Sequence, residues 1–385
     1  MDPLMEEQSS DPSETRSARR LAGGVVKKTV FPIEVLAGGN RQGADLRQLW
    51  QPYGVARDTS TGETYVADMM NHRIQRWTDG GSPETVFGGT FGGGLDQLKY
   101  PRGLALLSGS LYIADSGNHR VLRWDVSGGS SAVVVAGEWG VLYDRQNQVR
   151  ANDASCCRGG SGVNQLRDPH GVFVDGSGDI YVADTGNDRV QKVSSGVATT
   201  FAGNGMASPG TNALLTKPEG VFASSSDVYV SDTGQHRVVK YALAGGDGTV
   251  VAGGNGVGGA LDQLSSPSGL FVDENAEELG VPIINVYVVD TDNHRVMRVR
   301  DDTQAATLVA GGCLENPDYI VPCIQGGLHD PLRPWPDNDA ELNPSSDNPP
   351  VYHFFGPSGL HVYLGTTVNI TVADTLNHRV LMWFS

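Results

Sequence analysis

The segment YIADSGNHRV, residues 112–121, decides the fold because six versions of it occur along the chain. Each version is an apolar run that ends in Asp and continues through a short polar turn into Arg-Val or Arg-Ile. Runs of Val, Ile and Tyr bounded by Asn, Asp and Gly are typical of strands joined in hairpins. The six are YVADMMNHRI (65–74), YIADSGNHRV (112–121), YVADTGNDRV (181–190), YVSDTGQHRV (229–238), YVVDTDNHRV (287–296) and TVADTLNHRV (371–380).

Two further signals flank these segments and complete a unit of four strands. Pro-x-Gly precedes every segment and opens an apolar run, and a β-branched run ending in glycine follows five of the six. We therefore expect strand a after Pro-x-Gly, strand b ending in Asp, strand c from Arg-Val and strand d ending in glycine. Four-stranded units in series predict an all-β propeller. The Pro-x-Gly positions are 52–54, 101–103, 169–171, 218–220, 267–269 and 357–359.

The number of strands predicts a closed ring of six blades. Six a–b–c sets occur, but the last has no strand d after it, whereas FPIEVLAGGN (31–40) reads as a strand d with no set before it. Pairing this segment with the last unit removes exposed strand edges. We expect one domain over 29–385. Its blades span about 52–89, 101–137, 169–205, 218–256, 267–312 and 357–385 plus 29–40.

The Gly and Pro content indicates a chain rich in turns, and the net charge limits the classes of partner that the protein can bind. The 51 Gly and 20 Pro among 385 residues make 18%, against a usual ~12%. The formal net charge is −16, and residues 1–28 are neutral overall, so the acidic excess lies in the predicted domain. Such a body is a poor match for a phosphate backbone, which argues against nucleic acid as a partner. Residues 1–28 are rich in Ser and charge and are predicted to be a disordered tail.

Targeting signals are weak in this sequence. No apolar run approaches the ~18 residues of a membrane-spanning helix. The N-terminal residues lack the apolar stretch of a secretory signal. A cytoplasmic location is therefore the default expectation, and we expect a monomer.

The repeated units resemble NHL repeats, a family named for an Asn-His-Leu-like triplet. The resemblance covers nearly the whole chain after residue 28 and implies a six-bladed propeller that binds proteins or peptides. Because each Asp, His and Arg set belongs to a different blade, the sets cannot converge on one ion, and we interpret them as scaffold. The triplets are 71–73, 118–120, 293–295 and 377–379, with variants at 187–189 and 235–237.

Functional residues are expected where the blades differ. The middle residue of Pro-x-Gly lies at the start of the innermost strand, so its side chain should point toward the mouth of the central channel. A base, an acid, a cation and a phenol around one opening could serve a lyase or hydrolase, and a solvated rim is the alternative interpretation. The six residues are Tyr53, Arg102, His170, Glu219, Ser268 and Ser358.

The Pro-His sequence at the start of blade 3 can be compared with the zinc site of a related enzyme. Peptidylglycine amidating lyase is also a six-bladed propeller with NHL-like blades, and in that family three His from Pro-His motifs bind a catalytic zinc. Only Pro169-His170 resembles this pattern here. One His cannot supply about three protein ligands, so we expect no catalytic zinc at the channel mouth. The sequence patterns also predict no other cofactor.

Insertions are the second way in which the blades differ. Two long inserts, about 138–163 and 313–355, join strand d to the next strand a, so they emerge on the same face as the channel mouth. Long loops in a compact domain are usually functional or disordered. A smaller insert, about 273–284, lies on the opposite face. All four cysteines fall in the long inserts, and free thiols, disulfides and metal ligation all remain open for them: Cys156, Cys157, Cys313 and Cys323.

Blade 1 also carries Met69-Met70 in place of the usual Thr-Gly turn. Methionine is favoured at adaptable binding surfaces, and a locally packed turn is the alternative.

The resemblance to NHL domains, together with the position of the inserts, implies a non-enzymatic scaffold that binds a protein or peptide through the face bearing the inserts. The acidic body favours a basic partner by electrostatic steering. The alternative function is a propeller lyase or hydrolase that uses His170 with Glu219, Arg102 and Tyr53. RNA binding, which some NHL domains perform with a basic face, fits this acidic body poorly.

Overall fold

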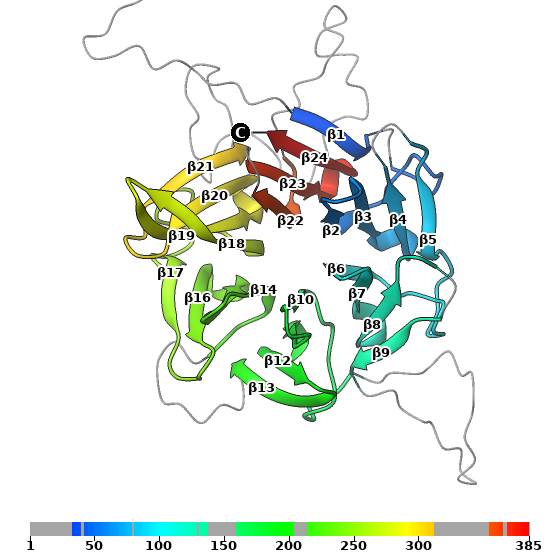
Figure 1. Cartoon of the computed structure of the whole chain (residues 1–385), viewed down its shortest axis with the longest axis horizontal. Coiled ribbons are helices and arrows are strands. Elements are labelled where there is room, and N and C mark those ends of the chain that lie inside the picture. Colours follow the sequence, from blue (N-terminus) through cyan, green and yellow to red (C-terminus); the bar gives the residue numbers. More distant parts are fainter. Residues whose placement is uncertain are drawn as a thin grey trace, which may run out of the picture. The chain divides into compact units, whose positions relative to one another are not determined.

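The protein is an all-β, six-bladed propeller, seen in the computed structural model as six four-stranded sheets around a central axis (Figure 1). Neighbouring strands in every sheet are antiparallel, and the sheet order follows the chain from the innermost strand outward in blades 1 to 5. The structure describes residues 33–39, 42–78, 81–128, 131–137, 159–203, 214–311, 354–364 and 368–384.

The strands follow the signals of the sequence repeat, except that the innermost strand of blade 3 begins at Val172, directly after Pro-x-Gly. Blade 1 contains β2 (Pro52–Asp58), β3 (Glu63–Asp68), β4 (Arg73–Trp77) and β5 (Glu84–Gly88), and blade 2 contains β6 (Pro101–Leu107), β7 (Ser110–Asp115), β8 (Arg120–Asp125) and β9 (Val133–Ala136). Blade 3 contains β10 (Val172–Val174), β11 (Ile180–Asp184), β12 (Arg189–Ser194) and β13 (Val197–Gly203), and blade 4 contains β14 (Pro218–Ala223), β15 (Asp227–Asp232), β16 (Arg237–Ala242) and β17 (Thr249–Gly253). Blade 5 contains β18 (Pro267–Glu278), β19 (Val281–Asp290), β20 (Arg295–Arg300) and β21 (Ala306–Gly311), and blade 6 contains β22 (Pro357–Leu364), β23 (Val368–Asp374), β24 (Arg379–Phe384) and β1 (Ile33–Gly38).

The ring closes as predicted. Strand β1, near the start of the chain, pairs antiparallel with β24, near its end, and Ile33 lies opposite Trp383. Blade 6 is therefore built from both ends of the sequence, and its outer strand is supplied by the segment that lacked its own a–b–c set.

The core lies between the blades as well as within them. Ile74 of blade 1 packs in one buried cluster with Leu122 of blade 2 and with Leu98, which precedes β6. Burial of such side chains stabilises the fold by ~1.5–3 kcal/mol each. Each blade therefore depends on its neighbours for part of its core.

A buried Asp–Arg pair joins two loops in each blade. The Asp115 carboxylate accepts a hydrogen bond of 2.8 Å from Arg120 Nε and another of 2.7 Å from the Lys99 amide. The guanidinium also donates to carbonyl oxygens of the loop before β6, those of Gly93 and Gly94 among them. The Asp–Arg pair thus connects the b–c turn to the loop before strand a. The equivalent pairs are Asp68–Arg73, Asp184–Arg189, Asp232–Arg237, Asp290–Arg295 and Asp374–Arg379.

The histidine of the repeated turn links each blade to the next one. His119 has a left-handed φ of 56°, and its Nδ1 accepts a 3.0 Å hydrogen bond from the Asp168 amide of blade 3. Blade 3 has Asp188 at this position, and that carboxylate accepts from the Lys217 amide at 2.8 Å. The other links run to His72 from Tyr100, to His236 from Ser266, to His294 from Gly356 and to His378 from Gln51.

We expect acidification to weaken these links. Burial lowers the pKa of His72, His119 and His294 below the ordinary value of 6.5, so the unfolded chain takes up protons first as the pH falls. Their contribution to stability is full above about pH 6.5 and is lost below it. Calorimetry should therefore give a lower Tm at pH 5.5 than at pH 7.5. The variant His119→Asp keeps an acceptor of the blade 3 type and should show a smaller drop; an equal drop would contradict this assignment.

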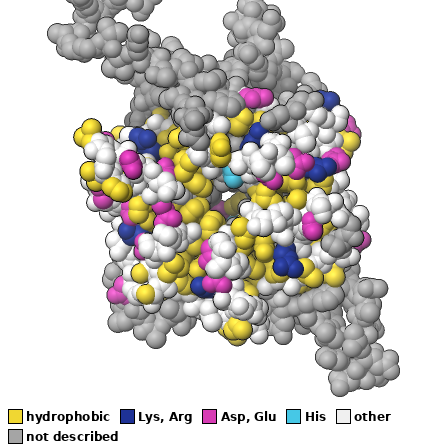
Figure 2. Space-filling view, viewed as in Figure 1, with side chains coloured by type: hydrophobic (Ala, Val, Ile, Leu, Met, Phe, Trp, Pro, Cys, Tyr) yellow, Lys and Arg dark blue, Asp and Glu magenta, His cyan; other side chains and the backbone are white. Residues whose placement is uncertain are grey.

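The glycine of each Pro-x-Gly sets the distance between neighbouring innermost strands. A Cβ on Gly103 would overlap the carbonyl oxygen of His170, and the Gly103 amide donates to that same oxygen at 2.8 Å. All six glycines meet the next blade in this way, and the six contacts surround the central channel, whose opening is visible in Figure 2. The pairs are Gly54 with Arg102, Gly103 with His170, Gly171 with Glu219, Gly220 with Ser268, Gly269 with Ser358 and Gly359 with Tyr53.

Replacing one of these glycines by alanine should push two neighbouring innermost strands apart and destabilise the fold. We expect Gly103→Ala to lower the free energy of unfolding by about 1–3 kcal/mol, because an atom is forced into an occupied position. Gly176 is a matched control, since a Cβ there meets nothing within 4 Å, and Gly176→Ala should change stability by less than about 1 kcal/mol. Urea unfolding of both variants is the measurement, and equal stabilities would refute the role given to Gly103.

No helix in the described part of the chain is long and apolar enough to cross a membrane.

Candidate functional site

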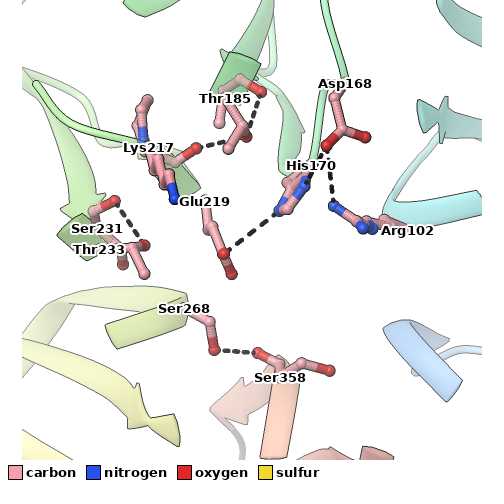
Figure 3. Close-up of polar contacts among 12 residues, drawn as sticks. Arg102, Asp168, His170, Thr185, Lys217, Glu219, Ser231, Thr233, Ser268 and Ser358 are labelled. Atoms are coloured by element: carbon pink, nitrogen blue, oxygen red, sulfur yellow. Dashed lines mark hydrogen bonds and ion pairs between the residues drawn. The ribbon is translucent and has the colours of Figure 1, made fainter. Parts of the chain in front are cut away.

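Three of the Pro-x-Gly middle residues form one hydrogen-bonded cluster at the channel mouth. The Tyr53 hydroxyl donates to Glu219 Oε2 at 2.5 Å and lies 3.4 Å from His170 Nδ1. The same His170 nitrogen lies 3.5 Å from Glu219 Oε1, and Figure 3 shows these two side chains pointing toward each other. Because the residues come from blades 1, 3 and 4, their contacts cross the channel mouth.

Asp168 is a further member that the sequence patterns did not reveal. Its Oδ2 lies 3.3 Å from His170 Nε2 and 3.6 Å from Arg102 Nη1 (Figure 3). His170 is therefore held between two carboxylates, one on each ring nitrogen. Asp168 directly precedes Pro-x-Gly, and the blades differ at this position too, which was the available signal. The six residues there are Gln51, Tyr100, Asp168, Lys217, Ser266 and Gly356.

Arg102 joins the cluster but keeps unused donors. Its guanidinium carbon lies 5.4 Å from the centroid of the Tyr53 ring. Arg102 Nε and Nη1 are buried, and neither has a hydrogen-bond partner within the described residues. Buried donors are normally paired, so these two nitrogens are an exception among the described residues.

The electrostatics give the members of the cluster different charges. Burial, assisted by the negative charge of Glu219, raises the pKa of Tyr53 well above 10, so the phenol stays neutral and donates. Burial alone would raise the pKa of Glu219, but hydrogen bonds from His170 and Tyr53 and the charge of Arg102 lower it overall. The site therefore presents a carboxylate, a phenol and a cation at neutral pH.

Ser268 and Ser358 do not join this cluster. Ser268 Oγ donates to the carbonyl oxygen of Ser358 at 3.0 Å, and Ser358 Oγ donates to that of Tyr53 at 3.0 Å. Both serines are buried. Their hydroxyls connect neighbouring blades, so the polar cluster occupies blades 1 to 4 of the mouth.

Met69 and Met70 lie apart from the cluster, in the b–c turn of blade 1. They are half-buried and belong to the short helix η1 (Met69–Asn71). Other blades have Ser or Thr at the Met69 position, and the Thr185 hydroxyl, for example, donates to the Pro218 carbonyl of the next blade at 2.6 Å. Met69 brings no hydroxyl to the equivalent contact.

Several expectations fall on residues that the structure leaves undescribed. Most of the two predicted inserts lies there, at 138–158 and 312–353. The four cysteines lie there as well: Cys156, Cys157, Cys313 and Cys323. Within the described residues, no group of three or more His, Cys, Asp or Glu side chains is arranged to hold a metal ion.

A repeated apolar loop tip is the second feature that the sequence patterns did not reveal. In the loop before β2, the Gln48 amide donates to the Asp45 carbonyl at 3.0 Å, which makes a turn with Leu46 at its tip. The signal was a Gln-Leu pair shortly before Pro-x-Gly, as in Gln48-Leu49. The tips at this turn position are Leu46, Leu95, Val163 and Leu261, of which Leu46, Val163 and Leu261 are 51%, 52% and 51% exposed and Leu95 is half-buried.

A comparison with family models identifies the repeat. The NHL repeat model matches residues 98–124 and 166–193, which contain the b–c turns of blades 2 and 3. The chain is an NHL-repeat β-propeller. The search of curated proteins finds no match to it.

Solved structures show the same architecture at low sequence identity. The NHL-repeat propeller is similar to a protein of unknown function from Bacteroides thetaiotaomicron (15% identity, TM-score 0.59, 91% of this chain and 75% of that chain covered). It is similar to an auxiliary nutrient binding protein from the same organism (12%, 0.57, 91% and 75%). It is also similar to a gluconolactonase from Xanthomonas campestris (13%, 0.53, 92% and 89%). At these identities the likeness establishes the fold alone.

Proposed function

We propose that this propeller is a binding scaffold for a protein or peptide. The binding surface would be the mouth face, which comprises the loops before each strand a, the b–c turns and the polar cluster. The observation that carries the proposal is the set of exposed apolar tips on this face, Leu46, Val163 and Leu261. Apolar residues scattered singly over a surface are normal, but these three recur at one turn position around the mouth, so a partner that spans this face could contact all of them.

Hydrogen bonds within the protein order the loops that carry these tips, so no binding partner is needed to fix their conformation. Beneath Leu46, the Arg73 guanidinium donates to the carbonyl oxygens of Ala44, Asp45 and Gln48 at 2.7–3.0 Å. A loop that is ordered in advance loses little conformational entropy on binding. The repeat therefore supports apolar contacts at fixed places around the mouth.

The centre of the same face offers polar recognition. The unused donors of Arg102 suit a backbone carbonyl or a carboxylate of a bound chain. The net charge of −16 favours a basic partner, because long-range attraction accelerates encounter.

A random peptide library displayed on phage and selected on the purified protein tests this proposal. Selected peptides should lose at least about tenfold in affinity for the triple variant Leu46→Ser, Val163→Ser and Leu261→Ser, since few contacts carry most binding energy. The matched control, Val197→Ser, Leu279→Ser and Val281→Ser, replaces three exposed apolar residues at strand ends away from the mouth. Fluorescence polarisation of labelled peptides gives the affinities.

Two results would contradict the scaffold proposal. One is that no peptide is enriched even at low salt. The other is that the control triple variant loses as much affinity as the mouth-face variant.

A second candidate function, a lyase or hydrolase, is favoured by one specific observation. His170 lies between the carboxylates of Asp168 and Glu219, with the Tyr53 phenol 3.4 Å from Nδ1. A histidine oriented by carboxylates beside a neutral phenol can act as a general base or acid.

Turnover assays decide between the two functions. The substrates to be assayed are amidated-peptide precursors, lactones and esters. If the site is catalytic, His170→Gln should lower turnover by about 10²–10⁴-fold, whereas Ser268→Ala, at a hydroxyl outside the cluster, should leave it within a few-fold. Absence of turnover in the wild-type protein would retire this candidate.

A further inference from the structure

One layer of side chains crosses the channel below the mouth. The residue three positions after the middle of Pro-x-Gly pairs with the strand b tyrosine in five blades, as Phe222 pairs with Tyr229, and with Thr371 in blade 6. We call this layer the channel ring. Its members in order of blades are Ala56, Ala105, Phe173, Phe222, Phe271 and His361.

The channel ring is aromatic on one side. The ring centroids of Phe173 and Phe222 are 4.4 Å apart, and those of Phe222 and Phe271 are 5.1 Å apart. All three side chains are only half-buried. Each also packs against a buried cluster shared with a neighbouring blade, and the part left exposed belongs to an innermost strand, beside the channel. Blades 3 to 5 thus provide a continuous aromatic wall.

The opposite side of the channel ring is small. Blades 1 and 2 contribute Ala56 and Ala105, the smallest side chains of the layer. Hydrophobic side chains surround an opening at the middle of the molecule in Figure 2. Ala56 is buried in the core between blades 1 and 2, whereas Ala105 is only half-buried. Because alanine is small, this side leaves more of the channel open than a phenylalanine such as Phe222 would.

The Arg102 guanidinium, which has unpaired hydrogen-bond donors, lies on the same side of the channel as Ala105. Arg102 lies in the same strand as Ala105, three residues nearer the mouth, and its Nε and Nη1 are buried without a hydrogen-bond partner in the described part of the chain. The Asp168 carboxylate faces it at 3.6 Å, which is an ion pair but too long for a hydrogen bond. Hydrogen bonds from a guanidinium to a carboxylate are about twice as strong as neutral ones.

We propose that the channel binds a small aromatic carboxylate. The carboxylate would accept hydrogen bonds from Arg102, and the aromatic body would pack against Phe222 and its neighbours in the room left by Ala105. The site shares Arg102 with the polar cluster of the mouth face, but its aromatic body would lie below that face and does not depend on the apolar loop tips of the scaffold proposal.

His361 completes the channel ring without adding charge. Burial, with a smaller contribution from Arg57, lowers its pKa to about 4. The ring is therefore neutral at physiological pH, which keeps this layer suited to an apolar body.

Three matched probes test the proposal by isothermal titration calorimetry: 2-naphthoate, neutral 2-naphthamide and cationic 2-naphthylmethylamine. The wild-type protein should bind naphthoate at least about tenfold more tightly than either of the others. The variant Arg102→Met should abolish this preference while still binding naphthamide. Arg298→Met, at an exposed arginine of an outer strand, is the matched control and should bind as the wild type does.

A second variant tests the place of binding. Ala105→Phe fills the small side and should weaken naphthoate binding at least about tenfold, with the Tm showing whether the fold is retained. If it fails to fold, Phe222→Ala, which removes the middle of the wall, should give the same loss. The proposal is overturned if naphthoate shows no preference over the amide and amine, if it fails to bind at 1 mM, or if the folded channel variant binds it normally.

The two proposals fail separately. The mouth-face triple serine variant should bind naphthoate as the wild type does, because none of its changes touches the channel ring. Loss of naphthoate binding in that variant would place the probe on the mouth face and contradict the channel site.

Discussion

The close approach of neighbouring innermost strands at Pro-x-Gly is the constraint on which the rest of the structure depends. At each of the six contacts, the next blade's carbonyl oxygen occupies the place that a Cβ would take. Only glycine allows this approach, and repeating it six times fixes how narrow the channel is. The middle residues of Pro-x-Gly are adjacent to these contacts, which is why Tyr53 of blade 1 reaches Glu219 of blade 4 at 2.5 Å.

The repeated Asp, Arg and His residues look reactive in the sequence, but their polar groups are used in hydrogen bonds that hold the fold together. The buried Asp115 carboxylate and Arg120 guanidinium neutralise each other, and their remaining hydrogen-bonding groups are paired with loop amides and carbonyls. A buried ion pair of this kind gains little net stability, because desolvation offsets the attraction. Its consequence here is geometric, since it fixes the loop that carries an apolar tip such as Leu46. The repeated histidines accept hydrogen bonds from the next blade and leave no set free for an ion.

The sequence was sufficient for the fold because each blade repeats the same local chemistry. The six blades and the pairing of 31–40 with the last blade followed from counting strands. The positions of the candidate site also followed, because the first residues of innermost strands must surround the channel. Which of them would meet could not be predicted: a short serine such as Ser358 reaches only a neighbouring carbonyl, whereas Tyr53 spans the opening. The role of Asp168 was missed although its position differs between blades, because its contacts with His170 and Arg102 depend on side-chain geometry. Its left-handed φ of 46° is shared by the equivalent residues of the other blades and does not distinguish it.

The channel shows how a repeated scaffold supports specific sites. Six equivalent strands offer six equivalent positions in each layer, so a symmetric sequence would produce a symmetric channel. Here the layers depart from symmetry in different blades: the mouth is polar on blades 1 to 4, and the channel ring is aromatic on blades 3 to 5 and small on blades 1 and 2. Arg102 and Ala105 lie in one strand, so the unmet donors and the free room fall on the same side of the channel. That coincidence supports the proposed ligand site over mere filling of the channel, because filling alone requires neither the alanines nor an arginine whose buried Nε and Nη1 have no hydrogen-bond partner among the described residues.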